Sequence, residues 1–147
     1  MYSDFKKSGV IHKIVNSKIK NMLYEGISAL EITKFIENEI KNLTKYEQNN
    51  PTKSGIGFPV GIGINDVAAH FTPSEENNPI IKCDDVVKID YGVHINGCIS
   101  DGAFSWCPSG KYDDLIKVSQ EATEIGIKNA GPDAILGSIG SEIFEFI

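Results

Sequence analysis

Two aspartates that stand eleven residues apart, Asp90 and Asp101, are the side chains of this sequence best placed to do chemistry. They flank Asn96-Gly97, which lies between two runs with strand-like alternation. Asn-Gly favours a two-residue type I′ hairpin turn, because both residues tolerate positive φ. Counting back from that turn predicts this register: Ile95 opposite Cys98, Gly92 opposite Asp101, and Asp90 opposite Ala103.

The two faces of the predicted hairpin differ sharply in polarity, because side chains alternate across a strand and opposed residues share a face. One face is apolar and predicts a core: Val87, Ile89, Tyr91, Val93, Ile95, Cys98, Phe104 and Trp106. The other face carries Asp90, Gly92, His94, Ile99, Asp101 and Ala103. Asp90 and Asp101 are diagonal neighbours there, at roughly 7–8 Å. The small residues Gly92 and Ala103 leave room beside them.

Two carboxylates this close repel each other unless something compensates their charge. A shared proton would do so, and a divalent cation would do so better, because hard cations prefer oxygen ligands. The alternative is a pair of solvated aspartates on the open face of a hairpin. Both acids lie in mid-strand positions where Asp is disfavoured, so the alternative loses weight.

The Gly-rich stretch from Gly55 to Pro73 approaches this face and contains His70. It lacks the Gly-Lys-Ser/Thr ending of a phosphate-binding loop, and its glycine spacing does not match the dinucleotide fingerprint. We expect a strand over about 62–64, a turn at Asn65-Asp66, and a short strand that ends at His70. That path would let His70 return toward the two carboxylates.

The other two histidines carry less promise of function. His94 shares the carboxylate face by register but lies next to the hairpin turn, so we expect a structural or peripheral role. His12 stands among lysines on a predicted amphipathic helix, and we expect a plain surface residue.

Four helices are expected to support the hairpin. Apolar periodicity predicts helices over 4–25, 29–43, about 112–129, and from about 138 onward. The spacing of Ser28 and Glu31 predicts a capping box for the second helix, and the polar composition of residues 44–54 predicts a loop. The last helix is still apolar and periodic at Ile147, so we expect the sequence to be truncated there.

Composition narrows the class of protein. The 147 residues fit one domain, and 41% apolar content can build a core. A net charge of −6 argues against nonspecific binding to nucleic acid or anionic membranes. Neither a signal peptide nor an apolar run of about 20 residues is present. The three cysteines lack CxxC spacing and indicate neither a disulfide framework nor a zinc site. We expect a reduced, cytoplasmic protein.

Several segments together resemble the N-terminal half of the type 2 methionine aminopeptidases, a branch of the pita-bread metallopeptidases. The Ala-Ala-His-aromatic-Thr-Pro run separates type 2 from type 1, and the step from Asp90 to Asp101 matches the first two metal ligands of the family. The resemblance spans essentially all 147 residues and rests on these segments: Phe58-Pro59, Asn65–Pro73, Lys88–Gly92, His94, Gly97, Asp101–Phe104, Lys111-Tyr112 and Gly126–Lys128.

This resemblance implies an α+β pita-bread (creatinase/aminopeptidase) fold, an antiparallel sheet with helices packed on one face. It also implies two divalent metal ions (Co, Mn, Fe or Zn) held by two Asp, one His and two Glu. Asp90 and Asp101 match the two Asp, whereas the His and both Glu belong to the half of the family that is absent here. His70 resembles the catalytic histidine that hydrogen-bonds the scissile amide on the substrate side. Phe58 resembles a wall of the methionine pocket.

The resemblance also implies a function, the removal of initiator methionine from the N-termini of nascent polypeptides, with the ribosome as a further partner. Residues 1–147 would form the N-terminal half of the catalytic domain and would be inactive alone. Either the missing half or self-association would then complete the fold. The alternatives are a non-peptidase homologue that keeps the fold as a ribosome- or protein-binding module, and a genuinely short protein that acts only by binding. Non-peptidase relatives typically lose the metal ligands, whereas Asp90, Asp101 and His70 are intact here.

Overall fold

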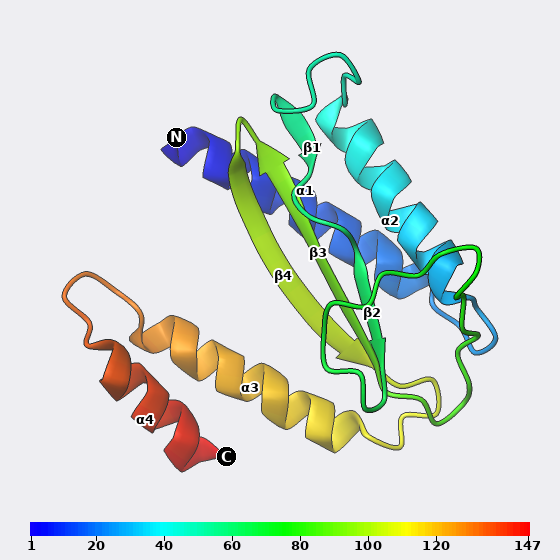
Figure 1. The fold of residues 1–147 in the computed structure, drawn as a ribbon. Helices are drawn as coiled ribbons and strands as arrows, with labels where there is room; N and C mark the ends of the chain where they lie inside the picture. The colour runs from blue at the N-terminus through cyan, green and yellow to red at the C-terminus, as the bar shows by residue number, and fades with distance from the viewer.

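The computed structural model describes residues 1–147 as four helices and four strands (Figure 1). In chain order the elements are α1 (Tyr2–Met22), α2 (Ala29–Thr44), β1 (Ser54–Ile56), β2 (Gly61–Ile64), β3 (Val87–Ile95), β4 (Cys98–Trp106), α3 (Asp113–Asn129) and α4 (Leu136–Phe146). No helix is long and apolar enough to cross a membrane.

The central strand of the antiparallel sheet is β3, which pairs with all three other strands. β4 runs along the full length of β3, and β1 and β2 share its opposite edge (Figure 1). The predicted register is confirmed at every position from Ile95 opposite Cys98 to Val87 opposite Trp106. Asn96 and Gly97 have φ of 50° and 77°, the positive values that a type I′ turn requires.

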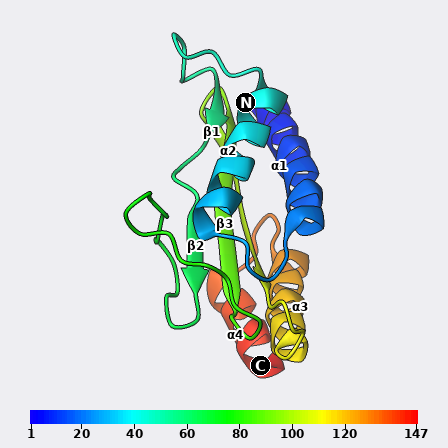
Figure 2. The same ribbon diagram turned by 90° about the vertical axis from the view of Figure 1, so that its right-hand side faces the viewer.

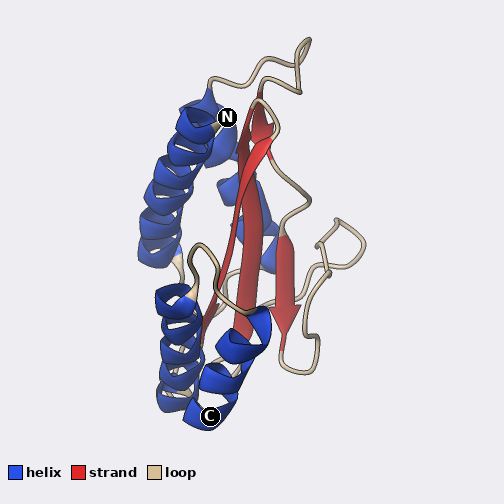
Figure 3. Ribbon diagram, turned by 90° about the vertical axis from the view of Figure 1, so that its left-hand side faces the viewer, coloured by secondary structure: helices blue, strands red, loops and turns tan.

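One face of the sheet is covered by α1 and α2, as the family resemblance implied. In Figures 2 and 3, α1 lies on one side of the sheet, and the loop that follows β2 projects on the other. The core lies between these helices and the sheet, and its fully buried members include Val15, Ile19, Ile32, Ile36, Ile40, Val87, Ile89, Tyr91 and Val93. The opposite face is left to the loops and carries the two aspartates.

Helix boundaries differ from the predicted ones by at most three residues. The largest difference is at the end of α1, which stops at Met22 instead of continuing to 25. The chain must leave the helix there, because Gly26 N donates to Ile81 O at 2.8 Å and Ile81 N donates to Ile27 O at 2.9 Å. These ladder-like bonds are incompatible with a helix. The Ser28 half of the expected capping box is present, since its side chain accepts from Glu31 N at 3.1 Å.

Two further expectations were wrong. Residues 44–54 are not entirely a loop, because Ser54 begins the short strand β1, which pairs with the end of β3. His12 is not a plain surface residue: it is half-buried, and its ring stacks on the ring of Tyr91. The lysines near His12 in the sequence are exposed, whereas His12 itself lies on the side of the helix that packs on the sheet. The sequence neighbours of His12 therefore did not indicate its burial.

A second helix pair, α3 and α4, lies beside the free edge of β4 (Figure 1). α3 contacts β4, whereas α4 contacts only α3. Many of the apolar side chains of this pair are exposed: Leu115, Ile127, Leu136 and Phe144 among them.

Candidate active site

The four side chains that the sequence singled out line one cavity of about 430 Å³ on the open face of the sheet. Phe58 and His70 come from the loops before and after β2, Asp90 from β3 and Asp101 from β4. The rest of the lining is small or polar: Pro59, Gly61 and Thr72. The sequence register thus placed both aspartates correctly, and the tertiary structure brings the other two residues to them.

The carboxylates of Asp90 and Asp101 lie close enough for their negative charges to repel each other. Asp90 is half-buried, and its Oδ1 atom is buried without a hydrogen-bond partner. Burial raises the pKa of Asp90, and the negative charge of Asp101 raises it further. A positive charge on His70 works in the opposite direction. An unpaired buried carboxylate oxygen is costly, so this geometry favours a cation beside Asp90.

The chain meets part of the requirement for a metal centre. Carboxylate oxygens suit hard divalent cations, and the orphaned Oδ1 of Asp90 offers one such donor. However, residues 1–147 contain no group of three or more His, Cys, Asp or Glu side chains arranged to hold a metal ion. The aspartate pair therefore fits a divalent cation as a partial ligand set.

Phe58 reaches the cavity because the segment between β1 and β2 crosses β3 at Gly92. Gly57 N donates to Gly92 O at 2.8 Å, which fixes the crossing point. A β-carbon on residue 92 would lie 2.7 Å from Phe58 Cδ1. Only glycine admits the aromatic ring here, so Gly92 places Phe58 directly beside the carboxylate pair.

The segment before His70 is not the short strand that the sequence predicted. Residues 65–72 have no regular strand or helix, and both Asn65 and His70 are left-handed, with φ of 53° and 63°. The chain instead folds back over β2, where Ile62 N donates to Phe71 O at 2.8 Å. A β-carbon on Gly63 would lie 2.5 Å from Val67 O, so glycine is needed for this return. His70 still arrives at the carboxylates, as expected, but by a loop.

Asn65 anchors the start of this loop, a role that sequence reasoning missed. Its side chain accepts a hydrogen bond from Val86 N at 3.0 Å and donates one to Asp85 Oδ1 at 2.9 Å. Its backbone carbonyl accepts from Lys88 Nζ at 2.5 Å. The only local signal was an Asn at a predicted turn, which does not reveal partners twenty residues away.

His94 lies outside the cavity lining. It sits beside the hairpin turn, where its Nδ1 accepts a long hydrogen bond of 3.4 Å from Gly97 N. This position agrees with the structural role expected from the sequence.

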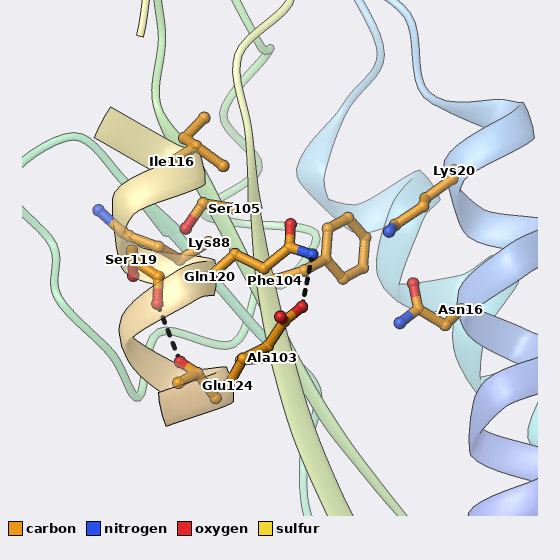
Figure 4. Close-up of a pocket in the computed structure, with 11 residues that line it drawn as sticks. Asn16, Lys20, Lys88, Ala103, Phe104, Ser105, Ile116, Ser119, Gln120 and Glu124 are labelled. Atoms are coloured by element: carbon orange, nitrogen blue, oxygen red, sulfur yellow. Dashed lines mark hydrogen bonds between the residues drawn. The ribbon is translucent and has the colours of Figure 1, made fainter. Parts of the chain in front are cut away.

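A second cavity of about 420 Å³ lies between α1, β4 and α3 (Figure 4). Asn16 and Lys20 extend into it from α1, and Ser119, Gln120 and Glu124 from α3. Gln120 donates to Glu124 at 3.5 Å within the helix. This cavity contains neither aspartate of the pair nor a histidine, so it offers no comparable chemistry.

Comparison with known proteins identifies relatives over nearly the whole chain. The chain is 44% identical over 147 residues to methionine aminopeptidase 2 of Candida dubliniensis, covering 98% of this chain and 32% of the relative. It is 41% identical over 144 residues to the enzyme of the same name from Clavispora lusitaniae, covering 98% and 33%. The chain thus spans about a third of the length of the curated relatives it matches.

Solved structures confirm the pita-bread fold. A methionine aminopeptidase from Thermotoga maritima superposes with a TM-score of 0.82 at 19% identity, covering 100% of this chain and 60% of the other. A prolidase from Thermococcus sibiricus gives 0.78 at 22% identity, covering 99% and 38%. The model of metallopeptidase family M24 matches residues 3–147. Because this match covers nearly the whole chain, the chain belongs to metallopeptidase family M24.

Proposed function

We propose that the protein is a type 2 methionine aminopeptidase, which removes the initiator methionine from nascent polypeptides in the cytoplasm. Residues 1–147 would form the N-terminal half of its catalytic domain. One observation carries the proposal: the aspartate pair, with its orphaned Asp90 oxygen, opens into a cavity that Phe58 and His70 also line. The relatives at 44% and 41% identity carry the name of this enzyme.

Membership of a metallopeptidase family implies a divalent metal cofactor. We assign Asp90 and Asp101 as ligands, and we infer a centre of two ions (Co, Mn, Fe or Zn) completed by a His and two Glu from outside residues 1–147. A divalent ion bound there would supply Lewis acidity and a water molecule of lowered pKa, the chemistry that peptide hydrolysis needs. The burial that raises the pKa of Asp90 would then be compensated by the positive charge.

The neighbouring side chains suit the substrate. The Phe58 ring lies against Gly92 beside the carboxylates and provides an apolar wall for a methionine side chain. His70 is exposed at the cavity, so its ring can donate to the scissile amide and exchange a proton with it. Its left-handed backbone is a costly conformation for a residue other than glycine, which is typical of functional positions.

A binding module without peptidase activity is the other reading of the fold. The geometry gives it less support, because a half-buried carboxylate with an unsatisfied oxygen has a cost that a pure binding role would not require. Nascent chains are the proposed substrate, with the ribosome as the place of encounter.

Replacement of each ligand in the full-length protein tests the proposal. Asp90→Asn and Asp101→Asn should each lower kcat/KM for a methionyl peptide by more than about 100-fold, because even residues behind metal ligands contribute 10- to 100-fold. Asp66→Asn, an exposed aspartate in the loop after β2, is the matched control and should retain activity. Near-normal turnover by either ligand variant at limiting metal would disprove the assignment.

A further inference from the structure

A histidine on α1 packs against the sheet directly behind the carboxylate pair. The rings of His12 and Tyr91 stack with centroids 4.3 Å apart and an interplanar angle of 8°. His12 Nε2 lies 3.2 Å from Tyr91 O and donates to it, and Tyr91 Oη donates to His12 O at 3.0 Å. The two residues are thus joined by a stack and two hydrogen bonds, across 79 positions of sequence.

The register of the hairpin places this contact between the two acids. Tyr91 is paired with Gly102, and these residues directly follow Asp90 and Asp101. A β-carbon on Gly102 would lie 2.7 Å from His12 Cε1 and 3.0 Å from His12 Nε2. The imidazole therefore packs against the Tyr91–Gly102 pair, which lies between the two carboxylates along the hairpin. It does so on the face of the sheet that the carboxylates do not occupy.

We propose that His12 is a positioning residue for the Asp90–Asp101 pair, an inference that rests on the proposed metal-binding function. Two like charges on adjacent strands repel each other. Gly102, on β4 between the two acids, has no side chain of its own that could pack against β3 and hold the two strands in place. The His12 side chain makes these packing contacts instead, from the face of the sheet opposite the carboxylates. Its bond to Tyr91 O holds the β3 backbone at the Tyr91–Gly92 peptide, one residue beyond Asp90, and its ring lies against Gly102, the opposite residue on β4.

Such support is needed because metal ligands bind well only when their own backbone and rotamers are fixed. Tyr91 is fully buried, and its hydroxyl bonds to His12 O. Loss of the imidazole would leave a void beside the Tyr91 ring and would remove the hydrogen bond from α1 to the Tyr91 carbonyl. The two carboxylates would then sample a wider range of separations.

Cobalt binding to the full-length protein tests the inference, with affinity measured by calorimetry and ligand geometry by the visible absorption of Co²⁺. His12→Ala should weaken Co²⁺ binding about 10-fold and alter the absorption bands. His12→Phe keeps the stack but not the Nε2 donor, so it should recover part of the affinity. Ile36→Ala, a fully buried site on α2, is the control: it should lower the melting temperature without changing affinity or spectrum.

A second pair of variants isolates the steric contact. Gly102→Ala should weaken Co²⁺ binding, because the new methyl group displaces the imidazole. In the His12→Ala background the same substitution meets no ring and should cause no further loss. This non-additivity would not arise if His12 merely stabilised the fold.

The outcomes separate this inference from the proposed function. If Asp90→Asn abolishes Co²⁺ binding but His12→Ala keeps wild-type affinity and spectrum, the positioning role is wrong and the metal pair stands. If Asp90→Asn itself keeps wild-type binding, the metal pair is wrong, and the positioning role falls with it. An effect of Ile36→Ala equal to that of His12→Ala would also overturn the positioning role.

Discussion

Replacement of Gly92 by alanine is the most direct test of how the cavity is built. The backbone at residue 92 is not left-handed, so alanine is allowed there and the effect comes from the added methyl group alone. That β-carbon would lie 2.7 Å from Phe58 Cδ1 and 3.2 Å from Phe58 Cζ. Carbon atoms pack best at about 3.5–4.0 Å, so the ring must move by about 1 Å.

The structure sets the size of the effect. Overpacking a tight interior costs about 1–3 kcal/mol, and Phe58 is only half-buried, so the free energy of unfolding should fall by about 1 kcal/mol as the ring swings outward. A displaced ring no longer forms the cavity wall. Lost apolar contact worth about 1.4 kcal/mol corresponds to a tenfold higher KM for a methionyl peptide, with metal content unchanged.

Urea unfolding and steady-state kinetics of Gly92→Ala, Phe58→Ala and the double variant decide the matter. The stability cost of Gly92→Ala should largely disappear in the Phe58→Ala background, because the clashing ring is gone. Gly61→Ala, on the neighbouring strand, is the matched control for the unfolding measurement alone, because Gly61 also lines the cavity: its β-carbon would find its nearest neighbour, Asp90 Cβ, at an ordinary 3.6 Å. If Gly92→Ala costs the same without Phe58, the reasoning about this contact is refuted.

Three further predictions concern single side chains. His70→Ala should lower kcat by about 10²–10⁴-fold with metal content nearly unchanged, and a fall in metal occupancy would instead make His70 a ligand. Tyr91→Phe should cost about 1 kcal/mol of unfolding free energy through the lost bond to His12 O. Burial raises the pKa of Tyr91 above its ordinary value of 10, so wild type should lose stability as pH rises beyond that value, and Tyr91→Phe should lose less in alkaline urea titrations. Ser28→Ala should cost about 1 kcal/mol in thermal unfolding, because the N-cap bond to Glu31 N is lost, and an unchanged melting temperature would contradict that role.

The sequence by itself determined the hairpin and the faces of its residues. Asn96-Gly97 specifies the turn, and the two-residue period of a strand then assigns every following side chain to one face. Local information alone therefore placed Asp90 and Asp101 correctly, as diagonal neighbours on one face of the hairpin. The helix boundaries were also predictable to within three residues, since apolar periodicity and the Ser28 cap are properties of neighbouring residues.

Only the tertiary structure decided how the rest of the cavity is assembled. Phe58 and His70 arrive on irregular segments whose paths depend on contacts with β2 and β3, at Gly63 and Gly92. The predicted strand before His70 failed because its backbone bonds to Ile62 and its Asn65 anchor involve partners that local patterns do not reveal. His12 was misjudged for the same physical reason. A side chain's burial is set by what packs on it from distant sequence, and the 79 residues between His12 and Tyr91 carry no local signal of their contact.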